Sequence, residues 1–249
     1  MPHTLIAYSA NIDSAVPIAV AALADQHVRV QANDVIVPEA MNVLIGAFAF
    51  GLNITRAQLV SPSLRRLVNH EISPINIGAL PLSPLAFNDN SMDPLVLDPS
   101  EALNLFAAES GAGATRVNCG VWLSDGETTP INGEVIAVRF TGTTTLVANS
   151  WTNAAITFDQ SLPAGRYQVV GMRAESAGLQ LARLVFVGGI WRPGCIGFAN
   201  AGQVEPNIFR DGGLGAWGEF AHNTPPTIDY LSNSADTAQA GVLDLIKLA

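Results

Sequence analysis

The feature that most constrains this 249-residue sequence is an internal repeat, because the chain aligns with itself when it is shifted by 125 positions. Over positions 34–60 the shift brings seven identical pairs together without a gap. About two such pairs would be expected by chance at average residue usage. Self-similarity at a fixed period indicates a duplicated structural unit. The pairs are Asp34–Asp159, Pro38–Pro163, Gly46–Gly171, Ala49–Ala174, Ala57–Ala182, Leu59–Leu184 and Val60–Val185.

The two copies of the repeat fill most of the chain. The same register returns near the end of each half, where Leu123 aligns with Leu248. The stretch 124–130 between the halves is polar and rich in turn-forming residues, as expected for a linker. We therefore predict an N-terminal domain of residues 1–124 and a C-terminal domain of residues 125–249.

Most segments of both halves are predicted to be β-strands. They are rich in Val, Ile, Leu and Phe, and Gly, Pro, Asn and Asp bound them. Their spacing favours an antiparallel sandwich over alternating strands and helices. The run at residues 242–248 also admits a helix, but the repeat favours a strand. The predicted strands are Val28–Ala32, Asn42–Phe50, Ala57–Val60, Arg116–Leu123, Val135–Phe140, Ala155–Phe158, Tyr167–Ala174, Leu179–Val187 and Val242–Leu248.

Each half also has one predicted short helix before its last strand. Asp98–Glu101 supplies an N-cap, a proline at the first helical position and a capping glutamate ahead of Ala102–Glu109. Thr224–Pro226 precedes Ile228–Leu231 in the same way. The predicted fold is thus all-β: two tandem eight-stranded jelly-roll β-sandwiches, each with one short helix.

The chain is acidic and poor in charge. Its net charge is −9, and 13% of its residues are charged, whereas about 25% is typical. Proteins that wrap nucleic acid need clustered Lys and Arg, so we expect no direct nucleic-acid binding. The adjacent pair Arg65–Arg66 is interpreted as a solvated loop or local salt bridge, in preference to a contact with a membrane or genome.

The residues needed for catalysis are not grouped in the sequence. His3, His27, His70 and His222 are isolated, with no His-x-His pair for a cupin-type metal site. There is no Gly-x-Ser-x-Gly elbow, and the single lysine, Lys247, does not belong to a phosphate-binding loop. We therefore expect a protein that is not an enzyme, with no catalytic residues, no cofactor and no metal site.

Two further features have a structural interpretation. Cys119 and Cys195 each lie in an apolar run, which favours buried thiols over a disulfide. The segment Asn88–Asp93 has the oxygen density of a calcium loop but lacks the acidic ligand at loop position twelve. An Asx-rich turn is the favoured interpretation, and calcium bound between subunits is the alternative.

The run Leu162–Gly171, its counterpart Val37–Gly46 and the tandem repeat resemble the double jelly-roll major capsid proteins of membrane-containing bacteriophages. These are the tectivirus, corticovirus and finnlakevirus types, and the chain length resembles the last two most. The resemblance implies homotrimers whose six barrels form pseudo-hexagonal tiles of an icosahedral shell over an internal lipid membrane. It also implies penton and minor capsid proteins as partners, and assembly of the virion in the host cytoplasm. It carries over no site residues.

Other functions remain open. Four tryptophans could form a carbohydrate platform, so a carbohydrate-binding double β-sandwich is the second hypothesis and a phage spike or fibre protein is the third. Asn200–Phe220 is predicted to be an exposed loop or intersubunit arm. Met1–Ala10 is predicted to be an arm towards the membrane or a neighbouring subunit. The tryptophans are Trp122, Trp151, Trp191 and Trp217.

Overall fold

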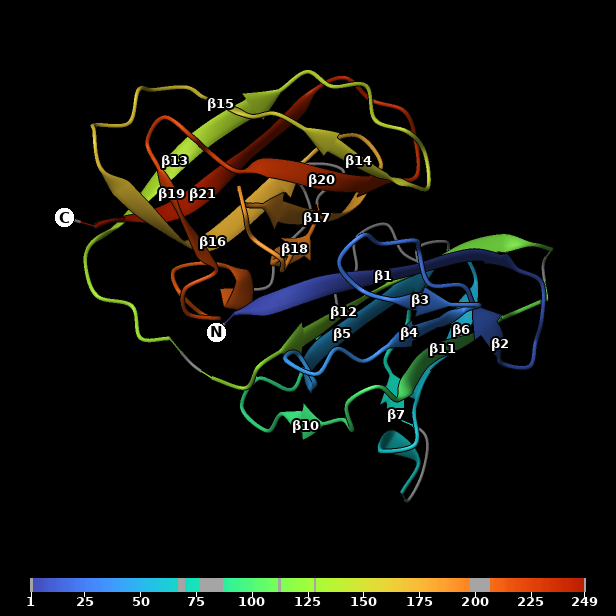
Figure 1. Ribbon diagram of the computed structural model, residues 1–249. Helices are drawn as coiled ribbons and strands as arrows, with labels where there is room; N and C mark the ends of the chain where they lie inside the picture. The colour runs from blue at the N-terminus through green and yellow to red at the C-terminus, as the bar shows by residue number, and fades with distance from the viewer. Residues whose placement is uncertain are drawn as a thin grey trace. The chain divides into compact units, whose positions relative to one another are not determined.

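The computed structural model of the protein divides into two compact units (Figure 1). One unit is Leu5–Gly126, and the other combines Met1–Thr4 with Glu127–Ala249. The division lies two residues beyond the predicted boundary, and the assignment of the first four residues to the C-terminal unit was not foreseen. The structure describes residues 2–66, 70–76, 87–111, 113–127, 129–197 and 207–248.

The N-terminal unit consists of two mainly antiparallel sheets. In each sheet, a strand from the end of the unit lies beside a strand from its middle. The first sheet has the order β1 (His3–Ile12), β12 (Thr115–Ser124), β5 (Val43–Gly51) and β10 (Leu95–Val96), with β8 (Ile75–Asn76) and β9 (Asn88–Asp89) also on β5. The second has the order β3 (Val30–Gln31), β4 (Asp34–Ile36), β11 (Ala102–Glu109), β6 (Ile54–Val60) and β7 (His70–Ile72), with β2 (Ile18–Val20) on β11.

The C-terminal unit is built in the same way. Its first sheet has the order β15 (Thr157–Phe158), β13 (Val135–Gly142), β21 (Gln239–Leu248), β16 (Arg166–Glu175) and β19 (Gly218–Ala221). Its second sheet has the order β14 (Trp151–Ala154), β20 (Thr227–Ser232), β17 (Leu179–Val185) and β18 (Gly194–Ile196). Each of the nine predicted strand segments contains a strand, including the C-terminal run.

The two units share one strand order. The eight principal strands are β1, β4, β5, β6, β7, β10, β11 and β12 in the N-terminal unit, and β13, β14, β16, β17, β18, β19, β20 and β21 in the C-terminal unit. When these strands are numbered from 1 to 8 along the chain, both units have sheets ordered 1-8-3-6 and 2-7-4-5. The equivalent strands β6 and β17 are related by the 125-residue shift at both ends.

Two β-bulges also recur at the same positions of the repeat. The extra residue is Ile45 in β5 and Val170 in β16, which are 125 positions apart. In the second pair of bulges, the extra residue is Thr55 in β6 and Gln180 in β17, which are again 125 positions apart. Bulges depend on backbone geometry, so their recurrence supports the duplication independently of residue identity.

The register predicted for the last strands was wrong. Trp122 lies opposite Gly46, and Asp244 lies opposite Gly171, so β12 and β21 are related by 122 positions and Leu123 corresponds to Leu245. An error of three residues would turn every side chain to the opposite face of its sheet. Loops of different length between the halves account for the change of register.

Both predicted helices are strands. Residues 102–109 form β11 and residues 228–231 lie within β20; no α-helix occurs in the described residues, whose only helices are the 3-10 turns η1 (Leu64–Arg66) and η2 (Asn207–Phe209). The apparent cap before β11 is a turn, in which Ser100 has φ of 65°. The side chain of Glu101 accepts hydrogen bonds from Ser63 instead of closing a capping box. Pairing on two sides overrides the local helix propensity.

Strand β1 also corrects a prediction. Residues 3–10 of the expected arm belong to a strand whose side chains are buried from His3 to Ser9.

The largest fully buried side chains of the N-terminal unit include Trp122, Tyr8 and Phe48, and those of the C-terminal unit include Tyr167, Tyr230 and Phe140. No helix in the described part of the chain is long and apolar enough to cross a membrane.

Candidate functional site

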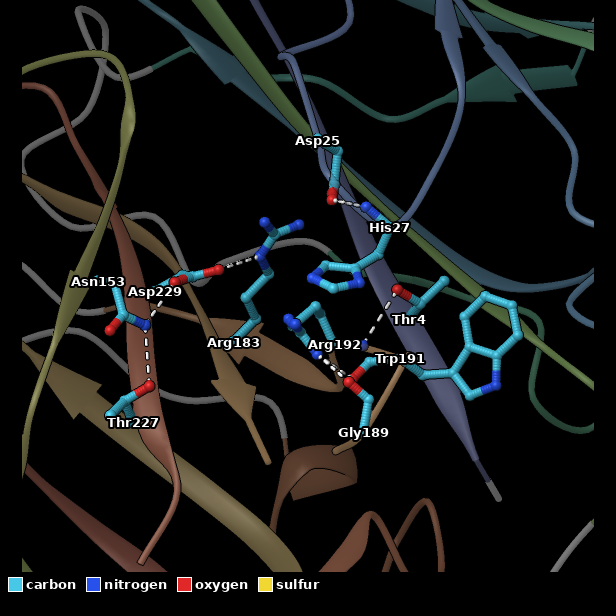
Figure 2. Close-up of polar contacts among 10 residues, drawn as sticks. All are labelled: Thr4, Asp25, His27, Asn153, Arg183, Gly189, Trp191, Arg192, Thr227 and Asp229. Atoms are coloured by element: carbon cyan, nitrogen blue, oxygen red, sulfur yellow. Dashed lines mark hydrogen bonds and ion pairs between the residues drawn. The ribbon is translucent and has the colours of Figure 1, made fainter. Parts of the chain in front are cut away.

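A polar row crosses the second sheet of the C-terminal unit (Figure 2). Asn153 on β14 lies opposite Asp229 on β20, which lies opposite Arg183 on β17. Directly opposed residues share a face of the sheet, so the three side chains meet. Arg183 Nε donates to Asp229 Oδ2 at 3.0 Å. Asn153 Nδ2 donates to Asp229 Oδ1 at 2.8 Å and to Thr227 Oγ1 at 2.9 Å.

The arginine of this row is almost completely buried. Its side chain is 4% exposed and that of Asp229 is 13% exposed. The guanidinium carbon of Arg183 lies 4.0 Å from the ring centroid of Trp151, a cation–π contact that is stronger in the absence of water. The row therefore combines an ion pair, hydrogen bonds and a stacked ring. Such a network fixes the geometry of the sheet and offers no free nucleophile or base.

The N-terminal residues bind next to this row within the same unit. The Thr4 hydroxyl accepts a hydrogen bond from the backbone N–H of Arg192 at 3.3 Å (Figure 2). Arg192 Nη1 donates to the carbonyls of Gly189 at 2.8 Å and Trp191 at 3.2 Å. His3 Nε2 accepts from Gly194 N–H at 3.2 Å. These hydrogen bonds hold residues 189–194 in one conformation.

In each unit a glycine at the same repeat position allows another segment to lie on the first sheet. At Gly46 a Cβ atom would lie 2.1 Å from the ring of Phe87, which packs edge-on against Trp122. At Gly171 a Cβ atom would lie 2.8 Å from the carbonyl oxygen of Phe209. Both glycines follow a bulge, so the backbone and the missing side chain together create the space.

A buried ion pair fixes the segment that lies over Gly171. Asp244 is completely buried on β21, and its Oδ2 accepts from Arg210 Nε at 2.5 Å and from Asp211 N–H at 3.1 Å. Arg210 Nη2 donates to Asp244 Oδ1 at 3.1 Å. The predicted arm Asn200–Phe220 is therefore wrong for its described part, which packs on the sheet from residue 207 and forms β19; residues 198–206 lie outside the described residues.

The run that carries the capsid resemblance forms a turn and the start of β16. The Tyr167 hydroxyl donates to the carbonyl of Pro163 at 2.8 Å. Gly165 between them has φ of 149°, a conformation that disfavours other residues. Backbone N–H of His222 donates to the carbonyl of Gly165 at 3.0 Å. These residues shape the entry to strand β16.

The four histidines are not brought together. His3 is buried against the edge of the Trp217 ring, with centroids 4.9 Å apart. His222 lies after β19 and His70 is on β7. His27 donates its backbone N–H to Asp25 Oδ1 at 2.9 Å, within the N-terminal unit (Figure 2). No group of three or more His, Cys, Asp or Glu residues with metal-binding geometry occurs in the described residues.

The cysteines and the Asx-rich loop have the predicted structures. Cys119 and Cys195 are both buried thiols that form no disulfide. Burial raises the pKa of the Cys119 thiol well above its usual range, which makes it unreactive. Asp89 Oδ1 accepts from Ser91 N–H at 2.8 Å, as in an Asx turn. Of the adjacent arginines, Arg65 is exposed on η1, and nothing is described for the Arg66 side chain.

The four tryptophans do not form an exposed platform. Trp122 and Trp217 are buried. Arg183 stacks on Trp151, and Trp191 is half-buried beside Arg192. Sugar recognition by ring stacking needs an accessible face, so this arrangement does not favour the carbohydrate hypothesis.

The sequence alone did not reveal the Arg183–Asp229 pair. Arg183 stands between apolar residues of a predicted strand, which is a signal for a buried partner. The partner was missed because Asp229 was assigned to a helix. No protein-family model and no curated protein matches this chain. The assignment of function therefore depends on the fold, the surfaces and the contacts described above.

Proposed function

We propose that this protein is a viral major capsid protein with a double jelly-roll fold. The observation that carries the proposal is the shared strand order of the two units, with bulges 125 residues apart. Sheets ordered 1-8-3-6 and 2-7-4-5 are the arrangement expected of an eight-stranded jelly roll built from two Greek keys. A tandem pair gives each chain two similar modules, which suits a pseudo-hexagonal tile made from three copies.

The composition of the surface supports a role in assembly. Val187 is 85% exposed, Ile190 is 62% exposed and Met92 is 94% exposed. Val187 and Ile190 lie on a loop whose conformation is fixed by Arg192. Exposed aliphatic side chains on a preorganised loop favour protein contact, because little entropy is lost on binding. Few charges need to be desolvated when such faces pack together.

The proposed assembly follows from the resemblance. Homotrimers would pack side by side into an icosahedral shell over an internal lipid membrane. The partners are other trimers, penton and minor capsid proteins, with possible contact to the membrane and no direct binding of nucleic acid. The protein would act in the virion, after assembly in the host cytoplasm, as a structural component and not as an enzyme.

Purification of the full chain followed by light scattering and electron microscopy tests this function. We expect particles with three times the mass of one chain and a pseudo-hexagonal outline. A protein that remains monomeric at all concentrations, and that binds glycans as a monomer, would contradict the proposal. A glycan-binding monomer would instead support the carbohydrate-binding alternative.

A further inference from the structure

Asn132 and Gly133 form an exposed dipeptide just before strand β13. They are the only Asn-Gly pair in the sequence. Both residues are exposed and lie outside regular secondary structure, and Gly133 stands two positions before Val135, where β13 begins. Glycine has no Cβ atom, so the backbone nitrogen that follows Asn132 is open to approach from the asparagine side chain. The fold therefore leaves an amide side chain beside an unhindered backbone nitrogen.

Neither of these two groups is used by the fold. Asn132 and the N–H of Gly133 make no hydrogen bond with any described residue. The two glycines that follow aspartates differ in this respect: Gly126 donates its N–H to a serine hydroxyl at 3.0 Å, and Gly212 donates to a carbonyl at 2.9 Å. A hydrogen-bonded N–H is held away from other partners, and breaking the bond costs free energy. Of the three nitrogens, only that of Gly133 is available to react.

The other asparagines lack at least one of these properties. Each is followed by a residue that carries a Cβ atom, which crowds the next backbone nitrogen. Asn118 is also only 2% exposed. After Asn90, the N–H of Ser91 donates to Asp89 Oδ1 at 2.8 Å. The structure therefore separates Asn132 from all other asparagines of the chain whose placement it describes.

We propose that Asn132 is a site of spontaneous deamidation in the folded protein. The backbone nitrogen of Gly133 loses its proton and attacks the side-chain carbon Cγ of Asn132. A nitrogen–Cγ bond forms, the bond from Cγ to Nδ2 breaks, and Nδ2 leaves as ammonia with the proton. The product is a cyclic imide, which water opens at either carbonyl to give aspartate or isoaspartate. Water is the only co-reactant, and the proposal does not depend on the capsid function.

The modification changes both the charge and the backbone at a packed position. The new carboxylate is ionised at neutral pH and makes the net charge of the chain more negative than −9. A Cβ atom on Gly212 would lie 2.2 Å from Ile131, and one on Gly133 would lie 2.6 Å from Ile246, so both sides of Asn132 are in contact with other segments. Isoaspartate adds one carbon to the main chain between these contacts, and at least one of them must shift.

Peptide mass spectrometry of the full chain during incubation in neutral buffer tests the proposal. We expect the peptide with Asn132 to lose its amide at least about 10-fold faster than any other peptide, and to become a substrate of protein isoaspartyl methyltransferase. The rate should rise with pH, because the attacking nitrogen must lose its proton. Asn132→Gln is the blocked control, since its longer side chain closes the ring far more slowly. Gly133→Ala is unsuitable, because φ of 132° and the contact with Ile246 would strain the fold.

Incubation in urea separates the effect of the fold from that of the dipeptide. We expect the folded and unfolded chains to react at Asn132 with rates within about 10-fold of each other. Reaction in urea with none in the folded protein would overturn the proposal, and so would faster loss of amide at another asparagine.

Thermal unfolding tests the change in the backbone. Aged wild-type protein should melt at a lower temperature than freshly purified Asn132→Asp, because only the aged chain contains the additional main-chain carbon. Equal melting temperatures after complete conversion to isoaspartate would overturn the inferred shift of the contacts at Ile131 and Gly133.

Discussion

The ion pair between Arg210 and Asp244 gives the sharpest prediction about stability. Asp244 has no exposed surface and accepts three hydrogen bonds, two of them from Arg210. Replacing Arg210 with Ala would leave a carboxylate buried with only the Asp211 N–H. Removing one partner of a buried pair costs about 3–5 kcal/mol. At roughly 4 °C per kcal/mol for a unit of this size, the melting temperature of the C-terminal unit should fall by about 12–20 °C.

Two variants control this measurement. Arg139→Ala breaks the ion pair with Asp159, whose side chains are 65% and 45% exposed, and should cost less than about 1 kcal/mol. The double variant Arg210→Met with Asp244→Leu removes both charges and should recover most of the loss, because no charge is left unpaired. Calorimetry resolves the two units if they unfold separately. A loss below about 1 kcal/mol for Arg210→Ala, or no recovery in the double variant, would refute the reasoning.

Three other predictions concern the fold. Gly171→Ala should lower the free energy of unfolding by about 1–3 kcal/mol in urea, because the added Cβ meets the backbone of residue 209. Gly46→Ala should cost less, because its added Cβ meets a phenyl ring that is able to turn. Deletion of residues 2–10 should abolish cooperative unfolding of the N-terminal unit by circular dichroism, because it removes the buried strand β1. Hydrogen bonds from Ser176 and three backbone N–H groups lower the pKa of Asp236, so Asp236→Ala should be less stable than wild type above pH ~4, and the difference should vanish as the pH falls through the depressed pKa. A destabilisation by Asp236→Ala that did not change with pH would contradict that assignment.

The repeat predicted the central strands because they carry the duplicated residues. β5, β6, β16 and β17 lie within the aligned block, and their bulges recur with it. β1 was missed because it lies before that block, where residue identity gives no guide. β11 was predicted as a helix because Asp98–Glu101 has the residues of an N-terminal helix cap, and only its pairing with β6 and β4 reveals the strand.

The polar contacts were harder to predict for a related reason. Asp229 meets Arg183 only because β20 pairs with β17, so an error in one element hid the pair. A sequence shows which residues are charged, whereas the fold shows which charges are balanced.

The glycines at repeat positions 46 and 171 show what the duplication has kept. Each follows a bulge and leaves room for a segment on the first sheet of its unit. The contact opposite the glycine differs completely: Trp122 packs against Phe87 in one unit, and Asp244 binds Arg210 in the other. The two halves therefore share backbone geometry while their side chains have diverged, which explains why the identity between them is low. In the proposed assembly of three copies, such divergence would give the alternating units different lateral contacts.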